Sequence, residues 1–454
     1  MSMSATPKVC LVSLGCARNL VDAEVALGDL LKHGYEYAAD VSNADIALIN
    51  TCGFTEEAKK ESLDAIFSLI DLKKRKKIRA IAVMGCLSQR YGSDLRDEMK
   101  EIDAIVGTGS YGELAKILEP LRQRQKVFEV QPRPKFLLDQ NSPRKRLTPL
   151  YTAYVKVSEG CINACSYCAI PKMKGPHRSR PIADILAEVE KLKGDSPLRE
   201  INLIGQDTAA FGFDRTRRFQ MPELLDALAQ KFPEVWIRPL YAHPAHVTRE
   251  WFEVTKRRPN LCRYLDLPIE HSHPDMLKRM NRGSTRQQMD QVIEWARTVP
   301  GMALRTAIIV GFPGETDDEF NDLLEYMKAV RFERLGGFTY SREDGTPAYG
   351  MDDQLPESLK EERLQRVMEL QRSITAEWNK SRVGKTLKVL IEEEYSVPGT
   401  QAPERIYLAR SETDAPEVDG QVFVHTHTPL KIGDFVDTKI TEALDFDLIG
   451  EYSA

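Results

Sequence analysis

The chain has 454 residues, of which 42% are hydrophobic and 29% charged, and a formal net charge of −5. This length predicts about two to four domains, and the composition excludes collagenous and low-complexity proteins. The N-terminal MSMSATPK lacks an apolar signal-peptide core and no apolar run approaches about 18 residues, so we expect a cytoplasmic protein with no membrane partner. Eight cysteines in such a chain suggest metal binding or catalysis.

Residues 8–120 alternate between strand and helix patterns. Strands are predicted at 9–13, 46–50, 80–84 and 104–106, and helices at 21–32, 56–72 and 111–121. This alternation predicts an α/β domain with a parallel sheet covered by helices on both faces. Ligands of such sheets bind at the carboxyl ends of the strands.

Three cysteines, Cys16, Cys52 and Cys86, each follow one of the first three strands. The topology should bring them to one edge of the sheet, and each adjoins a glycine that lets the backbone approach a bulky inorganic group. They form a set of three thiolates, one short of four, although three unrelated core cysteines are the alternative. Cys10 lies inside the first strand and is expected to be a small core residue.

The rest of the chain divides into a linker and two further domains. Residues 123–150 are rich in proline and basic residues and predict a linker between domain 1–122 and domain 151–380. The alternation of strand and helix patterns in domain 151–380 predicts a partial or complete β/α barrel, with functional residues on the loops after the strands. Its predicted strands are 154–157, 200–204, 236–240, 264–267, 303–310 and 334–338; its predicted helices are 182–192, 222–231, 249–256, 285–298 and 317–330.

The loop after the first barrel strand carries Cys161, Cys165 and Cys168 in a C-x3-C-x2-C spacing. Three thiolates can hold three irons of a 4Fe–4S cluster and leave the fourth iron free to bind a small molecule, whereas electron-transfer clusters normally have four cysteines. A Cys3His zinc site with His177 and a site without metal are the alternatives.

A long helix at 356–382 connects to the last domain, residues 381–454, which is all β and predicts a small barrel. Strands are expected at 389–392, 406–410, 422–425 and 435–440. Residues 383–454 contain six basic and fourteen acidic residues, a net charge of −8. His425 and His427 are expected to be a surface pair, and His243 and His246 to be loop residues rather than catalysts.

Taken together, the chain resembles the radical S-adenosylmethionine methylthiotransferases over essentially its full length. The order of a flavodoxin-like domain with three scattered cysteines, a radical S-adenosylmethionine barrel and a TRAM domain is that of the family. The segments that carry the resemblance are SLGCARNLVDAE, YCAIPKMKGPHRSRP, LDLPIEHSHPDMLKRMNR, FTYSREDGTPA and DFDLIGE. Two departures are Lys174, where relatives often have arginine, and Glu270, where they often have glutamine.

The resemblance implies two 4Fe–4S clusters, one on each cysteine trio, with S-adenosylmethionine bound at the open iron of the barrel cluster. It implies that Tyr167 lies near the adenine, and that Gln206, Glu270 and Gly311 contact the cofactor. The radical formed from S-adenosylmethionine would abstract hydrogen from an unactivated carbon, and the second cluster would supply the methylthio group. Flavodoxin or ferredoxin is the expected electron donor.

The resemblance also implies the substrate, which is the twelfth protein of the small ribosomal subunit, modified at the β-carbon of an aspartate. A second reason is the acidic C-terminal domain, which should attract a basic protein and repel the phosphates of tRNA. A tRNA adenosine methylthiotransferase is the alternative within the family. An adaptor for ribosome assembly, stabilised by zinc, is the alternative outside enzymes.

Overall fold

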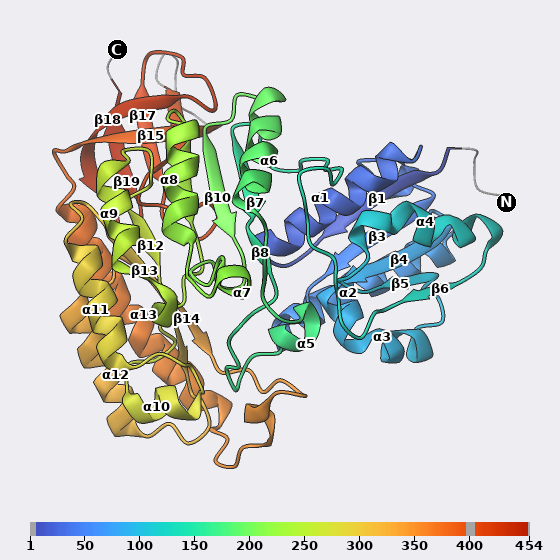
Figure 1. Cartoon of the computed structure of the whole chain (residues 1–454), viewed down its shortest axis with the longest axis horizontal. Helices are drawn as coiled ribbons and strands as arrows, with labels where there is room; N and C mark the ends of the chain where they lie inside the picture. Colours follow the sequence, from blue (N-terminus) through green and yellow to red (C-terminus); the bar gives the residue numbers. More distant parts are fainter. Residues whose placement is uncertain (1–5, 396–404, 453–454) are drawn as a thin grey trace.

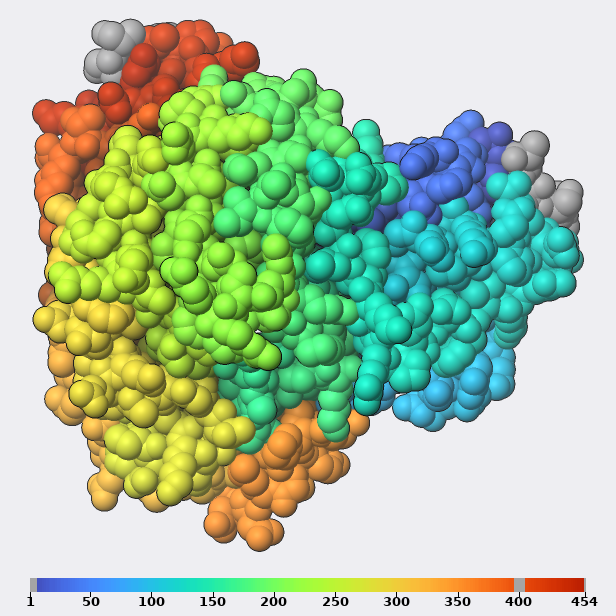
Figure 2. Space-filling view, in the orientation of Figure 1, coloured from blue at the N-terminus to red at the C-terminus, as the bar shows by residue number. Residues whose placement is uncertain are grey.

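The structure is a computed structural model that describes residues 6–395 and 405–452, and it consists of two large lobes and a small barrel (Figure 1). The N-terminal domain forms a separate lobe, blue to cyan in Figure 2, that packs against the barrel domain. None of the helices in the described ranges has the length and apolarity needed to cross a membrane.

The N-terminal domain is a six-stranded, fully parallel sheet in the order β2-β1-β3-β4-β5-β6. The first five strands follow the order of the flavodoxin-like fold, as expected. The strands are β1 (Lys8–Ser13), β2 (Glu36–Tyr37), β3 (Ile46–Thr51), β4 (Ala80–Gly85), β5 (Ala104–Val106) and β6 (Val127–Glu129). The α-helices are α1 (Ala17–Lys32), α2 (Glu56–Lys74), α3 (Cys86–Glu98) and α4 (Leu114–Leu118), and the 3-10 helices are η1 (Val41–Asn43), η2 (Tyr111–Glu113) and η3 (Glu119–Gln123).

Two predictions for this region were wrong in detail. The stretch expected to be a linker contains β6, which pairs with β5 and completes the sheet edge. Its three residues are too few to show a periodicity of their own. The helix expected at 111–121 is divided into η2, α4 and η3, with Pro120 in the first turn of η3. Helix α3, which begins at Cys86, was not predicted.

The central domain is a six-stranded partial barrel of parallel strands, formed by β11-β10-β7 and β12-β13-β14. Its strands are β7 (Thr152–Lys156), β10 (Glu200–Ile204), β11 (Trp236–Pro239), β12 (Tyr264–Asp266), β13 (Ala303–Val310) and β14 (Arg334–Thr339). A two-stranded ribbon, β8 (Ser158–Glu159) and β9 (Arg178–Ser179), follows β7. The six predicted strands are confirmed, each within two residues at its ends.

The helices of this domain are α5 (Ile170–Lys174), α6 (Ile182–Gly194), α7 (Phe213–Thr216), α8 (Met221–Lys231), α9 (Arg249–Arg257), α10 (Pro274–Arg279), α11 (Arg286–Arg297), α12 (Asp317–Val330) and α13 (Glu357–Lys380), with 3-10 helices η4 (Pro244–His246) and η5 (Pro347–Gly350). The longer helices, namely α6, α8, α9, α11, α12 and α13, cover the outside of the strands (Figure 1) and bury an apolar face in the barrel core. Thr285 and Thr316 begin α11 and α12 with capping boxes, which fixes both starts from local sequence.

The C-terminal domain is a closed five-stranded barrel in the order β15-β16-β17-β19-β18. Its strands are β15 (Thr386–Tyr395), β16 (Arg405–Ser411), β17 (Val422–Thr426), β18 (Phe435–Ala443) and β19 (Leu448–Glu451), of which β19 was not predicted. It packs against the amino-terminal ends of the central strands. Arg410 pairs with Glu200 at the start of β10, and Asp414 pairs with Arg334 at the start of β14.

This packing changes what the net charge of −8 of residues 383–454 implies about the surface of the C-terminal domain. Several acidic residues of the small barrel are held in buried pairs, such as Asp414 with Arg334 and Asp419 with Arg305. Among its described residues, seven acidic and five basic side chains are exposed, so its surface is only slightly acidic. It also lies at the end of the barrel opposite the cysteine loop, which follows β7. The charge of this domain is therefore a weaker guide to the substrate than the sequence suggested.

Candidate active site between the N-terminal domain and the barrel

Both cysteine trios line one cavity of about 250 Å³ between the N-terminal domain and the barrel. Cys16, Cys52 and Cys86 lie at the carboxyl ends of β1, β3 and β4, as the parallel topology predicted. The other three cysteines lie on the loop that follows β7 and β8. The lining residues of the two trios are Cys16, Cys52, Cys86, Cys161, Cys165 and Cys168.

Close backbone packing holds the first trio together. Gly15 has a positive φ of 86°, and a Cβ at this position would lie 2.9 Å from the Cβ of Cys52 and 3.2 Å from its sulfur. Only glycine therefore brings Cys16 and Cys52 this close. Ser62 on α2 fixes Cys52 by accepting its backbone N–H and donating to its carbonyl, at 3.0 and 2.9 Å.

The thiols of this trio differ in their electrostatic surroundings. Desolvation raises the pKa of Cys86 to about 12 and also raises the pKa of Cys52. Desolvation also acts on Cys16, but the guanidinium of Arg18 more than offsets it, and the pKa of Cys16 is lowered. Arg18 donates from Nε to the sulfur of Cys16 at 3.5 Å.

The second trio is supported by hydrogen bonds to its sulfurs. Asn163 donates to the sulfur of Cys161 from its backbone at 3.4 Å and from its side chain at 3.6 Å. Arg282 donates to the sulfur of Cys165 at 3.5 Å. Desolvation raises the pKa of Cys168 to about 12. The thiol is therefore neutral at physiological pH unless a bound metal displaces its proton.

Three of the four residues expected to contact the cofactor line this cavity, namely Tyr167, Gln206 and Glu270. Gln206 donates to Glu159 at 2.9 Å, and its side-chain oxygen has no hydrogen-bond partner among the described residues. Desolvation raises the pKa of Glu270, and Arg282, 3.6 Å away, only partly offsets this. Glu270 also has a φ of 66°, which is unusual for a residue other than glycine.

Gly311 is not among the lining residues of this cavity. A Cβ at Gly311 would lie 2.3 Å from the Cγ of Lys360, and its φ is 75°, so close packing and backbone conformation account for the glycine. Its backbone N–H donates to Glu315 at 2.6 Å.

Sequence reasoning missed several residues of the cavity wall, among them Arg18, Lys174, Tyr241 and Arg282. Arg18 is two residues from a cysteine, and this spacing was the one local signal for a role in the site. Tyr241 and Arg282 come from distant loops and become neighbours of the cysteines only in the folded chain. Lys174 had been noted only as a departure from the family.

A network of buried charges joins the two domains beside this cavity. Asp22 on α1 pairs with Lys156, and it also pairs with Lys174 at 2.7 Å. Glu159 completes the network at 2.9 Å from Lys156 and 3.9 Å from Lys174. Desolvation raises the pKa of Glu159, but the two lysines outweigh it and the resulting pKa is about 2.

A second ion-pair cluster joins the domains through the loop after β14. Glu343, which is buried, accepts from Lys59 at 3.0 Å and from Arg90 at 2.8 Å, and Arg90 also reaches Asp344 at 2.8 Å. Ion pairs from α1, and from α2 and α3, therefore attach the N-terminal domain to the barrel at two separate places.

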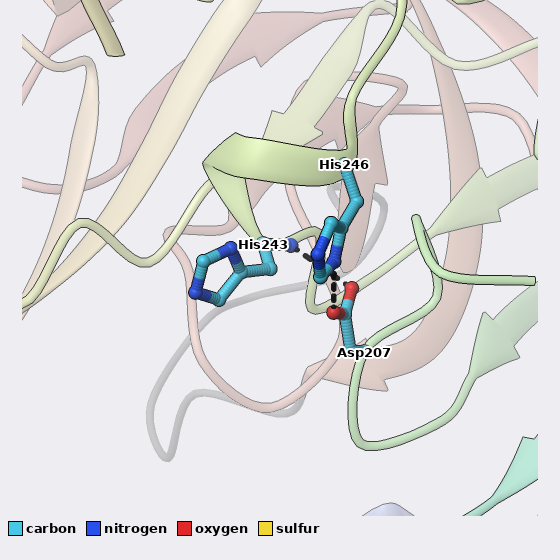
Figure 3. A group of neighbouring side chains, drawn as sticks. All are labelled: Asp207, His243 and His246. Atoms are coloured by element: carbon cyan, nitrogen blue, oxygen red, sulfur yellow. Dashed lines mark hydrogen bonds and ion pairs between the residues drawn. The ribbon is translucent and has the colours of Figure 1, made fainter. Parts of the chain in front are cut away.

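Neither His177 nor His243 is placed to complete a zinc site with the cysteines of the loop. His177 is bonded to Ser179 at 3.0 Å and does not line the cavity, so it does not join the three cysteines of the loop. His243, His246 and Asp207 are close together, but the His243 ring points away from Asp207 (Figure 3). Both ring nitrogens of His243 are already bonded, to the Arg282 carbonyl at 2.7 Å and the Ala245 N–H at 3.2 Å.

Each cysteine trio supplies three thiolate donors to the cavity, and soft thiolates are the usual ligands of an iron–sulfur cluster. A structural zinc site takes four protein ligands, one more than either trio supplies.

Comparison with known families agrees with this architecture. Residues 8–107 match the uncharacterized protein family UPF0004, residues 155–327 match the radical SAM superfamily, and residues 383–452 match the TRAM domain. The fold is similar to that of the radical S-adenosylmethionine methyltransferase TsrM from Kitasatospora setae, with a TM-score of 0.56, 14% identity, and coverage of 88% of this chain and 77% of that one.

Curated relatives match nearly the whole chain. The ribosomal protein uS12 methylthiotransferase RimO of Thermoanaerobacter sp. (strain X514) is 44% identical over 97% of this chain and 99% of its own length. RimO of Geobacter sulfurreducens is 44% identical over 99% of both chains. The chain therefore belongs to the RimO family of radical S-adenosylmethionine methylthiotransferases, and it is a transferase.

Proposed function

We propose that this enzyme transfers a methylthio group to the β-carbon of an aspartate in ribosomal protein uS12. The observation that carries the proposal is the single cavity lined by both cysteine trios. Such a cavity can bring a group held by the N-terminal domain next to a substrate activated in the barrel. The names of the relatives supply the protein substrate, which comes to this chain as a proposal.

Under this proposal the six cysteines hold two 4Fe–4S clusters, and S-adenosylmethionine binds beside Cys161, Cys165 and Cys168. When bound, the clusters and S-adenosylmethionine supply the radical and sulfur chemistry. Tyr167, Gln206 and Glu270 are the proposed contacts to the S-adenosylmethionine molecule. Gln206 is suited to this role because its side-chain oxygen is buried and unpaired among the described residues.

The walls of the cavity supply what a radical reaction needs from the protein. The two interdomain ion-pair networks hold the N-terminal domain against the barrel beside the cavity. The β-carbon of an aspartate is too weakly acidic for a base to remove its proton readily. The proposed route is therefore abstraction of a hydrogen atom by a radical, and no general base is assigned. Flavodoxin or ferredoxin is the proposed electron donor, and the cytoplasm is the proposed location.

Counting iron and sulfide in anaerobically purified protein tests the two clusters. Cys16→Ala and Cys161→Ala should each lose about half of the iron, because each variant removes a ligand of one cluster. Cys10→Ala is the control, since Cys10 is a buried cysteine of β1 that lies outside the cavity. Equal loss in the control, or a full iron content in Cys16→Ala, would contradict the proposal of a second cluster.

Mass spectrometry tests the substrate. Protein supplied with S-adenosylmethionine, sulfide and reductant should add one methylthio group to a uS12 peptide that carries the target aspartate, and it should not modify tRNA. Modification of tRNA with the peptide untouched would favour the tRNA enzyme. Zinc in place of iron would favour the ribosome-assembly adaptor.

A further inference from the structure

Arg18 stands in a position that the local structure does not favour. It lies in the first turn of α1, where the partial positive charge of the helix N-terminus opposes a cation. Its side chain is also half-buried, which adds a desolvation cost for the charge. Contacts outside the helix must compensate for both costs.

These contacts connect the N-terminal domain to two barrel loops. Nε of Arg18 donates to the sulfur of Cys16 at 3.5 Å, while Nη1 donates to the carbonyl of Gly205, after β10, at 3.1 Å. The guanidinium carbon lies 4.4 Å from the centre of the Tyr241 ring, after β11, in a cation–π contact. One side chain thus touches a cysteine of the first trio and two loops of the barrel.

The barrel holds Tyr241 in a strained conformation at this place. Its φ is 62°, in the left-handed region, where a bulky side chain is disfavoured. Two hydrogen bonds secure the strained backbone: its N–H donates to Asp266 at 2.9 Å, and its carbonyl accepts from Thr208 at 3.0 Å. Strain that the surroundings maintain in this way is typical of functional positions.

We propose that Arg18 is a positioning residue that fixes the cluster of Cys16, Cys52 and Cys86 at the barrel mouth and raises its reduction potential. The inference rests on the proposed second cluster. Hydrogen bonds to cluster sulfurs and nearby positive charge both stabilise the reduced, more negative state. The planar fork of arginine can serve the sulfur and the Gly205 carbonyl at the same time, which the ammonium of lysine matches poorly.

Arg282 provides a matched comparison on the other side of the cavity. It donates to the sulfur of Cys165 at 3.5 Å, the same distance at which Arg18 reaches Cys16. Each trio thus receives one guanidinium hydrogen bond. Arg96 on α3 supplies the negative control, since it makes a cation–π contact with Phe128 at 4.8 Å and does not line the cavity.

The test is a redox titration of the full chain with both clusters, monitored by electron paramagnetic resonance. The signals are assigned by their loss in Cys16→Ala and in Cys161→Ala. Arg18→Gln should shift the potential of the Cys16 signal downward and leave the other in place, and Arg18→Lys should shift it less. Arg282→Gln should shift only the Cys161 signal, and Arg96→Gln should shift neither.

Unchanged potentials in Arg18→Gln, or equal shifts of both signals, would overturn the inference. If Arg18→Gln loses the cluster of Cys16, Cys52 and Cys86, the potentials of Arg18→Lys are measured instead and compared with the wild type in the same way. Loss of half of the iron in both variants, with a native circular dichroism spectrum, supports the positioning role. Loss of all iron or of the native spectrum opposes it. If the wild type itself holds one cluster, the proposed function fails, whatever Arg18 does.

Discussion

The strongest test of the interdomain network is to remove the charge of Asp22. This carboxylate of α1 is buried, and it pairs with Lys156 and Lys174 of the barrel domain. In Asp22→Asn the shape of the side chain is kept and the charge is lost. In Asp22→Ala both are lost.

The expected cost follows from what remains in the interior. Without Asp22, two buried ammonium groups share one carboxylate, Glu159, which lies 2.9 Å from Lys156 but 3.9 Å from Lys174. Removing one partner of a buried ion pair typically costs about 3–5 kcal/mol, because the other charge stays buried and uncompensated. For domains of this size, that corresponds to a decrease in melting temperature of roughly 10 °C.

Thermal unfolding followed by circular dichroism measures the decrease. Both Asp22 variants should lose comparable stability, since the charge and not the shape is decisive. Asp71→Ala is the control: Asp71 pairs with Arg75 on the exposed surface of α2 at 2.9 Å, and such pairs contribute little. If Asp22→Asn melts within a degree or two of the wild type, the network does not hold the domains together as described.

Three further predictions follow from single contacts. The pKa of Glu159 is lowered to about 2 in the folded protein, so its carboxylate stabilises the fold fully above the unfolded pKa of about 4.3. This stabilisation is lost as the pH falls toward 2. The stabilities of the wild type and Glu159→Gln, measured by acid unfolding, should therefore become equal near pH 2. Gly15→Ala should lose about half of the iron because its Cβ would meet Cys52, whereas Gly34→Ala, with a similar φ and no atom within 4 Å, should keep its iron. Glu200→Gln leaves the buried Arg410 and Arg238 without their shared carboxylate, so limited proteolysis should release the C-terminal barrel sooner than in the wild type.

Local patterns in the sequence were sufficient to predict the three-domain order, nearly every central strand and the place of the six cysteines. Strand and helix periodicities are local properties, and parallel topology then requires the strand ends to share an edge. The elements that were missed are short or irregular. Strand β6 has three residues, and β19 has four in a stretch where acidic residues interrupt the apolar pattern.

The tertiary structure decided which charges meet. The net charge of the C-terminal domain follows from its sequence, but buried pairs such as Asp414 with Arg334 and Asp419 with Arg305 remove part of the acidic charge from its surface. The contact of Arg18 with Gly205 joins residues 187 positions apart, which no periodicity could indicate. Sequence by itself therefore determined most of the secondary structure and the two cysteine trios, because these depend on near neighbours. Only the tertiary structure brought both cysteine trios to one cavity and placed the guanidinium of an arginine beside each trio, because electrostatic contacts depend on distance in space.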